Sequence, residues 1–324
     1  DSGLAKAGLN KLGRLEIAWP SLVALPDEVM TALPKSSDQF WFPPLNGAHL
    51  ASPAWVLNVC ADAQIYSRGL DWLDKTWVGK VPVFNAPEAT RQAARDRKVE
   101  MFGAIEGLTV PATRRVSFST EADLLAAFEK SGMQYPVLLR PTRGQNGLGL
   151  IRIDGPSGWA NAIGTETMHE EHFLIQFEDY RTAEGEFLKA RVLFVDGVPF
   201  VRHVKAAAEW MVHNTAPASV PGFAKDREMG VIDALEADAD FMRICRDIGA
   251  ALPLDFFGAD IGVDLANRRF VLFEANASMA VFFPLRDTLT EGQLARRVRL
   301  QDTPAKALAE LIADPSRWRS QPAR

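Results

Sequence analysis

The sequence predicts a mixed α/β fold, and three observations lead to this prediction. Short apolar runs of strand length alternate with polar, helix-forming stretches along most of the chain. Residues 186–204 and 255–279 each consist of two apolar runs joined by a short polar turn, which is the pattern of a β-hairpin. The 324 residues are 47% hydrophobic, which is enough to fill large cores, so we expect two or three compact units.

Residues 14–86 are predicted to form the first unit, a small parallel α/β domain. Its strands are expected within residues 15–19, 55–62 and 81–85. The run from 55 to 62 is almost continuously apolar until it reaches Asp62, which is typical of a strand buried on both faces.

A basic helix is predicted to follow, from Asn85 to about Glu106. Asn85 suits the N-cap, Pro87 the first turn, and Glu88 the acidic position of a capping box. The positive side chains of this helix either form a solvated face or contact a phosphate group. They are Arg91, Arg95, Arg97 and Lys98.

A second α/β unit is predicted over residues 87–177. Thr120 and Asp123 are expected to cap a helix, and residues 136–141 to form the strand that comes after it. The apolar run at 173–180 predicts a further buried strand, which leads into a polar crossing.

A glycine-rich turn, TRGQNGLG, follows the strand at 136–141. Gly144, Gly147 and Gly149 allow backbone amides to close over a phosphate, as a flap between two strands. The spacing matches neither the dinucleotide fingerprint nor the phosphate loop, and an ordinary hairpin explains it equally well.

The hairpin at 186–204 is expected to turn at Asp196-Gly197. Alternation along its first strand places Lys189 and Arg191 on one face of the sheet. These two cations either pair with nearby carboxylates or hold a polyanion. Other positive or titratable residues on the return strand are Arg202, His203 and Lys205.

The hairpin at 255–279 carries the clearest functional pattern. If its turn centres on Asn267, Asp260 lies opposite Glu274 on the neighbouring strand. Asn276 shares a face with Glu274 because side chains alternate along a strand. Oxygen ligands alone, two of them charged, are what Mg²⁺ prefers, and three such ligands leave room for water and a substrate phosphate.

The alternative is that Asp260 and Glu274 are polar ends of a half-exposed hairpin. Glu274 argues against this alternative because it follows the apolar run 270–273, whose density predicts burial. A buried carboxylate without a partner is costly, and a bound cation would remove that cost.

Composition and charge exclude several classes of partner. The net charge of -5 gives no reason to expect nucleic acid or an anionic membrane surface as a partner. Cys60 and Cys245 are the two cysteines, and they match neither a disulfide framework nor a zinc site. We therefore expect a cytoplasmic location, and the composition leaves a homo-oligomer open.

Taken in order, these motifs resemble the ATP-grasp superfamily. The motifs are the basic helix, PVLLRP, the glycine flap, LIQFEDY, KAR, WMVHN, LDFFGAD and VLFEANAS. The resemblance covers roughly residues 55–280, and the chain is most similar to RimK-like carboxylate–amine ligases, some of which are attached to tetratricopeptide repeats. It implies an ATP-grasp fold, in which the small N-terminal domain precedes two α+β subdomains, 87–177 and 178–324, that clamp ATP between them.

The resemblance also implies roles for individual residues. Asp260, Glu274 and Asn276 match the positions that bind Mg²⁺ and bridge it to the nucleotide phosphates; two ions are expected, and Mn²⁺ is an alternative metal. The residues implied for catalysis are Arg191, Arg202 and Asn214. The residues implied for nucleotide binding are Arg97, Arg140, Gly144, Gln145, Asn146, Gly147, Gln176, Phe177, Glu178, Tyr180 and Lys189.

Three positions depart from the family pattern. An arginine, Arg95 or Arg97, stands where the family has a lysine before the central subdomain, and Arg140 stands in place of a second lysine. The proline-glycine pair expected after Asn276 is absent, and an apolar run follows instead. The acceptor end of the site is therefore expected to be more apolar than in glutamate-adding relatives.

The activity implied by the resemblance is an ATP- and magnesium-dependent ligase that joins a carboxylate to an amine through an acyl phosphate and releases ADP. Its partners are then ATP, an acid and an amine, each of the last two a small molecule or a peptide. Two alternatives stay open: a phosphotransferase on the same fold, and a non-catalytic nucleotide-binding or interaction domain. Formation of ADP without an amine distinguishes the first, and a thermal-shift assay with ATP and Mg²⁺ distinguishes the second.

Overall fold

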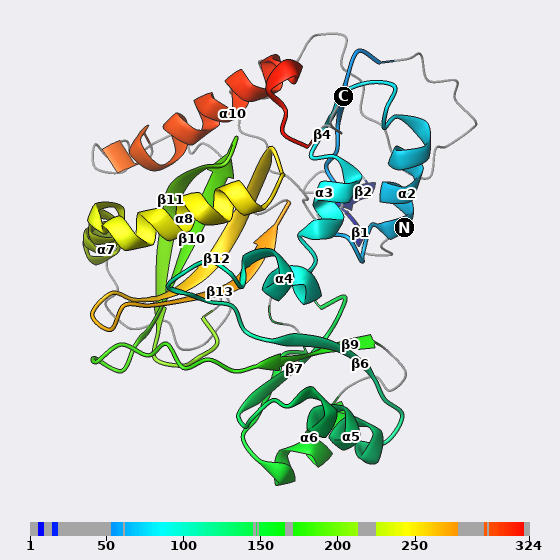
Figure 1. Ribbon diagram of the computed structural model, residues 1–324, viewed down its shortest axis with the longest axis vertical. Coiled ribbons are helices and arrows are strands. Elements are labelled where there is room, and N and C mark those ends of the chain that lie inside the picture. The colour runs from blue at the N-terminus through cyan, green and yellow to red at the C-terminus, as the bar shows by residue number, and fades with distance from the viewer. Residues whose placement is uncertain are drawn as a thin grey trace.

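The computed structural model describes residues 6–9, 15–18, 53–60, 62–144, 147, 149–165, 171–212, 225–277, 295–296 and 298–320. Within these residues the strands form two two-stranded sheets, one four-stranded sheet and one five-stranded sheet. Helices pack beside the larger sheets, so the fold is mixed α/β, as predicted (Figure 1). None of the helices in these ranges combines the length and the apolar character that crossing a membrane requires.

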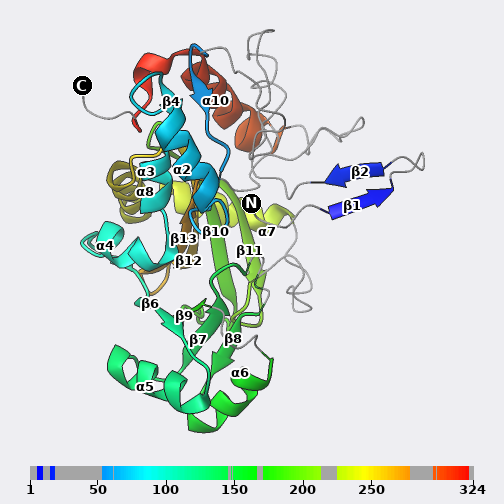
Figure 2. The same cartoon turned by 90° about the vertical axis from the view of Figure 1, so that its right-hand side faces the viewer.

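The N-terminal strands form two separate small sheets. β1 (Lys6–Leu9) and β2 (Leu15–Ala18) pair antiparallel with each other and stand to one side of the main body (Figure 2). β3 (Val56–Leu57) and β4 (Val83–Phe84) pair in parallel, with α2 (Ser67–Thr76) between them in the chain. A parallel pair is thus confirmed for β3 and β4, but its extension to residues 15–19 is wrong, because β2 closes a short local hairpin instead.

The single helix predicted from Asn85 to Glu106 is wrong. The chain forms α3 (Pro87–Gln92), the 3₁₀ turn η2 (Arg95–Arg97) and α4 (Lys98–Phe102). Asn85 is not the N-cap: Ala86 holds that position, and no side chain caps the helix. The buried Asn85 side chain instead bonds to residues 255 and 256.

Asn85 ties the N-terminal unit to the start of β12 (Phe256–Asp264). Its amide nitrogen donates to the carbonyl of Phe256 at 2.7 Å, and its amide oxygen accepts from the backbone nitrogen of Asp255 at 2.9 Å. Its backbone nitrogen donates to the Asp255 carboxylate at 2.6 Å. These long-range bonds replace the local bond of an N-cap.

The four-stranded sheet has the order β6-β9-β7-β8, and its neighbouring strands are antiparallel. Its strands are β6 (Thr113–Ser117), β7 (Val137–Pro141), β8 (Ile151–Ile153) and β9 (Glu171–Gln176). The helices α5 (Glu121–Ser131) and α6 (Trp159–Thr165), with the 3₁₀ turn η3 (Pro156–Gly158), cover one face (Figure 1). The predicted capping box of Thr120 and Asp123 is present at the start of α5.

The five-stranded sheet has the order β11-β10-β12-β13-β5. Its strands are β5 (Leu108–Thr109), β10 (Phe187–Val195), β11 (Val198–Ala207), β12 and β13 (Arg269–Asn276). β5 joins β13 in parallel, and the other neighbours are antiparallel. Both predicted hairpins are confirmed: β10–β11 turns at Asp196-Gly197, and β12–β13 turns across residues 265–268.

Helices cover one face of this sheet and leave the other face toward the four-stranded sheet. α7 (Lys225–Ala237) and α8 (Ala239–Ala251) pack on the sheet through a core in which Leu235, Phe241 and Ile244 are fully buried (Figure 1). α10 (Thr303–Ala313), between the π-helical turn η4 (Val298–Asp302) and the 3₁₀ turn η5 (Pro315–Arg317), packs at the end of β10.

Candidate functional site

Four polar side chains form a row across the five-stranded sheet. His203 on β11 pairs with Arg191 on β10, Arg191 pairs with Asp260 on β12, and Asp260 pairs with Glu274 on β13. Directly paired residues of neighbouring antiparallel strands place their side chains on the same face. The two carboxylates that the sequence placed opposite each other therefore do lie opposite each other, beside a cation and a histidine.

A β-bulge follows Asp260 on the side of the hairpin turn. Asp260 pairs with Glu274, but Ile261 pairs with Leu272, so the register skips Phe273. From Asp260 away from the turn, the strands pair as expected from a turn at Asn267. Between the bulge and the turn, the pairing is shifted by one residue. The bulge leaves the carbonyl of Phe273 to accept a hydrogen bond from Lys98 at 2.8 Å.

Asp260 is buried and held by two cations from β10. Arg191 donates to it from Nε at 2.7 Å and from Nη2 at 2.9 Å, and Lys189 Nζ lies 3.2 Å from Oδ2. Burial acts to raise the pKa of Asp260, but Lys189 and Arg191 outweigh burial and leave this pKa below its ordinary value. Asp260 is therefore an anion at neutral pH.

Glu274 lies where the segment between α3 and α4 meets β13. Arg95, whose side chain is 11% exposed, forms an ion pair with Glu274. Burial and the neighbouring Asp260 act to raise the pKa of Glu274, while Arg95, Arg140 and Lys189 lower it; the net direction is downward. Like Asp260, Glu274 is an anion at neutral pH.

Lys98 was not predicted as a site residue, although it faces this cluster. It is the first residue of α4 and is only 3% exposed. Burial, with Arg95 and Arg140 nearby, lowers the pKa of Lys98 to about 7, and Glu274 opposes the shift. The one signal in the sequence was its place among the basic residues of the predicted helix, where Arg97 was preferred.

Arg97 lies apart from the site. Its side chain is 37% exposed, and its guanidinium interacts with Glu100 and Glu88 on the helix surface. The break between α3 and α4 changes the direction of the side chains, so that Arg95 and Lys98 face the carboxylates and Arg97 faces outward.

Arg140 extends from β7 of the four-stranded sheet toward the same cluster. It is 8% exposed and donates to the carbonyl of Gly144, and among the described residues its buried Nε has no hydrogen-bond partner. Burial and the neighbouring Arg95 lower the pKa of Arg140 to about 9, against the effect of Glu274 and Asp62. Arg140 thus contacts Gly144 and lies close enough to Glu274 of the β12–β13 hairpin to interact with it electrostatically.

Five basic side chains therefore lie around Asp260 and Glu274 in the described structure, and a third carboxylate, Asp62, acts on one of them, Arg140. The basic side chains are Arg95, Lys98, Arg140, Lys189 and Arg191. Lys98 and Arg140 are buried and the other three are partly buried, and charge removed from water is stable only with a compensating partner. A polyanion such as a nucleotide triphosphate matches this excess of basic side chains.

The residues between β9 and β10 connect the two large sheets. The Gln176 side chain is occupied by backbone groups: it donates to the carbonyl of Gln134 at 3.0 Å and accepts from the backbone nitrogen of Gln134 at 3.0 Å. Phe177 stacks under the guanidinium of Arg152 at 4.3 Å. Burial raises the pKa of Glu178.

Tyr180, in the segment between β9 and β10, packs against strands β12 and β13 next to the site. It is 2% exposed and packs against Phe187 and Phe273, with ring centroids 5.1 Å apart in both pairs. A side chain at Gly262, two residues after Asp260, would lie 2.8 Å from the Tyr180 ring. Glycine at 262 is what lets the tyrosine cover the strand.

The other predicted residues are distributed as follows. Arg202 is 3% exposed on β11, near Glu228 and Arg296. Asn276 lines a small polar cavity together with Asp62 and Arg95. Gly147 is described with a φ of 72°, a value that favours glycine. Gln145, Asn146 and Asn214 lie outside the described residues.

The donor set suits a hard divalent cation. Asp260 and Glu274 supply carboxylate oxygens on neighbouring strands, and Asn276 adds an amide oxygen on β13. Within the described residues no group of three or more His, Cys, Asp and Glu side chains could hold a metal by itself. A cation at this place would therefore complete its coordination with water and phosphate oxygens, as Mg²⁺ commonly does.

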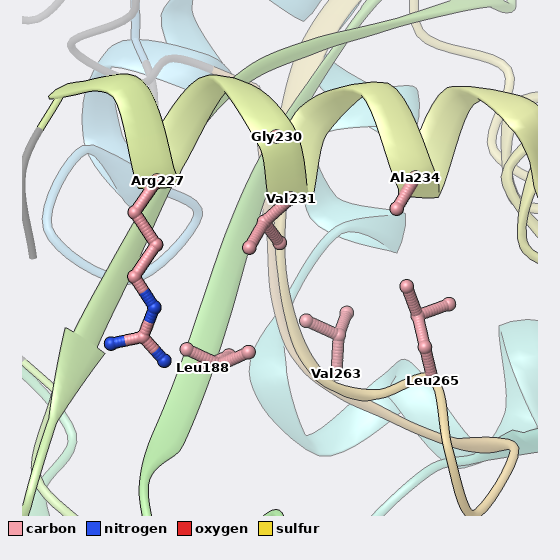
Figure 3. Close-up of a pocket in the computed structure, with 7 residues that line it drawn as sticks. All are labelled: Leu188, Arg227, Gly230, Val231, Ala234, Val263 and Leu265. Carbon is pink, nitrogen blue, oxygen red and sulfur yellow. The ribbon is translucent and has the colours of Figure 1, made fainter.

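A larger apolar pocket lies on the opposite face of the sheet (Figure 3). Its volume is about 350 Å³. Its lining residues are Leu188, Arg227, Gly230, Val231, Ala234, Val263 and Leu265. The charged residue among them, Arg227, donates to Glu186 at 2.9 Å, so the pocket does not offer the charge that phosphates require.

Comparison with known proteins gives distant structural likenesses. No protein-family model and no curated protein matches the sequence. The structure is similar to a RimK domain ATP-grasp protein from Sphaerobacter thermophilus, with a TM-score of 0.47 and 15% identity, covering 81% of each chain. It is also similar to carboxyaminoimidazole ribonucleotide synthase from Aspergillus clavatus complexed with ATP, with a TM-score of 0.46, 12% identity, and coverage of 69% of this chain and 53% of that one.

A third similar structure is VanG D-Ala:D-Ser ligase from Enterococcus faecalis, with a TM-score of 0.44 and 15% identity; 72% of this chain and 64% of that one are covered. The chain thus spans only 53% and 64% of the last two proteins. By name, these three proteins are an ATP-grasp protein, a synthase complexed with ATP and a ligase. Because every TM-score is below 0.5, the functional argument rests on the residues of the site.

Proposed function

We propose that this chain is an ATP- and magnesium-dependent ligase that joins a carboxylate to an amine through an acyl phosphate. The observation that carries the proposal is the pairing of Asp260 with Glu274 among five basic side chains. In this proposal residues 87–177 and 178–324 are the subdomains that clamp ATP, and a cytoplasmic location supplies the nucleotide.

The oxygens of Asp260, Glu274 and Asn276 would hold Mg²⁺, one or two ions, with Mn²⁺ as a substitute. When bound, the metal neutralises charge on the phosphates and orients them for transfer. Arg95 and Lys189, which pair with Glu274 and Asp260 in this structure, would then be available to bind the phosphate oxygens.

Cations from both sheets bind the nucleotide phosphates. Lys98 and Arg140 approach from α4 and β7, and Lys189 and Arg191 approach from β10. Arg140 donates to the carbonyl of Gly144 at the start of the glycine-rich turn, so closure of that turn would bring backbone amides to the same phosphates. Adenine binds in the connection from Gln176 to Tyr180, between the two sheets.

In the first step a carboxylate oxygen of the acid attacks the terminal phosphorus of ATP, and the bond from that phosphorus to ADP breaks. Arg191 stabilises the negative charge that spreads over the transferred phosphoryl group. In the second step the amine nitrogen attacks the acyl carbon, the carbon–oxygen bond to phosphate breaks, and the nitrogen loses a proton. Water must be excluded between the steps, which is the task of the closed flap.

Hydroxylamine trapping tests this proposal directly. Acyl phosphates react with hydroxylamine to give stable hydroxamates, which mass spectrometry identifies. The protein is incubated with ATP, Mg²⁺, hydroxylamine and a panel of amino acids, hydroxy acids and dicarboxylates. A hydroxamate that forms with ADP in equal amount supports the ligase. A phosphorylated hydroxyl compound would indicate a phosphotransferase, and absence of nucleotide binding would indicate a non-catalytic domain.

A further inference from the structure

We infer that Arg115 of β6 is a positioning residue of the proposed nucleotide site, because its side chain joins two segments that carry the phosphate-binding groups. The first segment is the η2 turn, which contains Arg95 and leads directly into Lys98. The second is the start of the glycine-rich turn, at Thr142. The inference rests on the proposed function, because it concerns how the nucleotide site is assembled.

Asp96 connects Arg115 to the η2 turn. Arg115 Nε donates to Asp96 Oδ2 at 2.6 Å, and Nη2 donates to Oδ1 at 3.2 Å, which is a two-pronged contact. The hydrogen bond to Asp96 is also the largest of the effects that raise the pKa of Arg115. Asp96 directly follows Arg95, which forms the ion pair with Glu274, and lies two residues before Lys98. The contact therefore holds the segment from which both cations reach the site.

Glu171 of β9 connects Arg115 to the glycine-rich turn. Arg115 Nη1 donates to the Glu171 carboxylate at 2.6 Å, and the carbonyl of Glu171 accepts from the backbone nitrogen of Thr142 at 2.9 Å. With its side-chain nitrogen toward Thr142, Gln64 donates to the carbonyl of Thr142 at 2.9 Å and accepts from Arg115. Both backbone polar groups of Thr142 are thus held by residues that contact Arg115.

Arg115 also lies in a row with Arg140 across the four-stranded sheet. Arg115 pairs with Phe173 of β9, and Phe173 pairs with Arg140 of β7, so the three side chains share one face. The Arg115 guanidinium lies over the Phe173 ring, 5.3 Å from its centre. Two strand spacings, or ~10 Å, separate β6 from β7, and the three guanidinium nitrogens of Arg115 already donate to carboxylates. Arg115 therefore acts through its neighbours and not by binding phosphate itself.

The bland alternative is that Arg115 and Asp96 form an ordinary surface ion pair. Their side chains are 34% and 25% exposed, and exposed ion pairs contribute little to the free energy of unfolding. Arg115 differs from an isolated pair because it contacts three segments that are far apart in the chain, at residues 64, 96 and 171. Its loss is therefore expected to disturb the site and to leave the overall stability nearly unchanged.

Calorimetric titration with ADP and Mg²⁺ tests the inference without turnover. The variants are Arg115→Gln, Arg115→Lys, Asp96→Asn, and Asp96→Asn combined with Arg115→Gln. The matched control is Arg114→Gln, which removes the same charge from the neighbouring exposed position of β6, on the other face of the strand. Lysine at 115 keeps the charge but cannot form the two-pronged contact with Asp96. Urea unfolding shows which variants are folded.

Arg115→Gln is expected to weaken the binding of ADP with Mg²⁺ by about 10-fold, and Arg115→Lys by about threefold. The double variant should bind no more weakly than Arg115→Gln, because the two residues act through one contact. Wild-type affinity in a folded Arg115→Gln protein, an equal loss in Arg114→Gln, or fully additive losses in the double variant would overturn the inference. If Arg115→Gln does not fold, wild-type affinity in Arg115→Lys would overturn it.

Hydrogen exchange of the free protein separates this inference from the proposed function. The backbone amides of Arg97 and Thr142 are hydrogen-bonded in the two segments that Arg115 joins. In the Arg115 variants these amides are expected to exchange faster than in the wild type and in Arg114→Gln. Unchanged exchange at both amides would overturn the inference. Failure of the wild type to bind ADP with Mg²⁺ would instead count against the proposed function, and the exchange rates would still decide whether Arg115 positions these segments.

Discussion

The ammonium group of Lys98 donates to the backbone carbonyl of Phe273, the residue that the β12–β13 register skips. The bulge thereby anchors a buried amine beside Glu274. Because burial and Arg95 hold the pKa of Lys98 at about 7, this amine is largely neutral above that pH until a polyanion binds.

Proton uptake on nucleotide binding follows from this arrangement. With a pKa of about 7 in the free protein, Lys98 is mostly deprotonated at pH 8, and bound phosphates raise its pKa again. Binding of ADP with Mg²⁺ at pH 8 is expected to take up ~0.9 proton. Calorimetry in buffers of different ionisation enthalpy measures this number, and Lys98→Met is expected to abolish the uptake. An equal uptake in Lys98→Met would assign it to another group.

The folded protein is predicted to lose stability in acid because of His203. Burial, with Arg191 and Lys205, lowers the pKa of His203 from 6.5 to about 3. Between these values the unfolded chain binds more protons than the folded one, so stability falls as the pH falls through this window. Urea unfolding at pH 7 and pH 5 is expected to show that the wild type loses about 2 kcal/mol more than His203→Asn. Parallel losses in both proteins would contradict the assignment.

Asn85 is expected to be a principal tie between the N-terminal unit and β12. Asn85→Ala removes the buried bonds to Asp255 and Phe256 and places alanine at a φ of 50°. The expected loss of unfolding free energy is about 3 kcal/mol, measured by urea titration. Gln92→Ala, which removes an exposed side chain of α3 with a 3.4 Å contact, is the control and should change stability by less than ~0.5 kcal/mol.

Gly262 is expected to tolerate no side chain. The Cβ of alanine would lie 2.8 Å from the Tyr180 ring and 2.9 Å from the Phe273 ring, so Gly262→Ala should cost ~1–3 kcal/mol and weaken nucleotide binding. Gly230→Ala, in α7 with no atom within 4 Å of the new Cβ, should instead stabilise by about 0.5–1 kcal/mol. A Gly262→Ala protein of wild-type stability would show that Tyr180 is free to move.

The hairpins and the capped helix could be predicted because their signals are local. Asp196-Gly197 supplies two residues of positive φ for a tight turn, and Thr120 with Asp123 supplies both halves of a capping box. The pairing of Asp260 with Glu274 was predicted correctly from a turn at Asn267, but the turn half of the hairpin has a register one residue lower, and the bulge at Phe273 restores the predicted pairing.

The errors lie where distant contacts override local preference. Asn85 has the composition of an N-cap but bonds to residues 255 and 256, 170 or more positions away. Ala94 has an extended backbone, which interrupts the predicted helix. The side chains after it therefore point in other directions than they would on one continuous helix. A continuous helix gives no means of choosing Lys98 over Arg97, whereas the broken one turns Lys98 inward.

The most direct test of the central claim is the thermal stability of Glu274→Gln with ATP and Mg²⁺. At 100 times the dissociation constant, Mg²⁺ and ATP should stabilise the wild type by about 2.7 kcal/mol, and ATP with a chelator by much less. The exposed control Glu106→Gln should behave as the wild type does. Loss of the metal-dependent stabilisation in Glu274→Gln is the predicted result, and its full retention would contradict a metal-bound nucleotide on the β12–β13 hairpin.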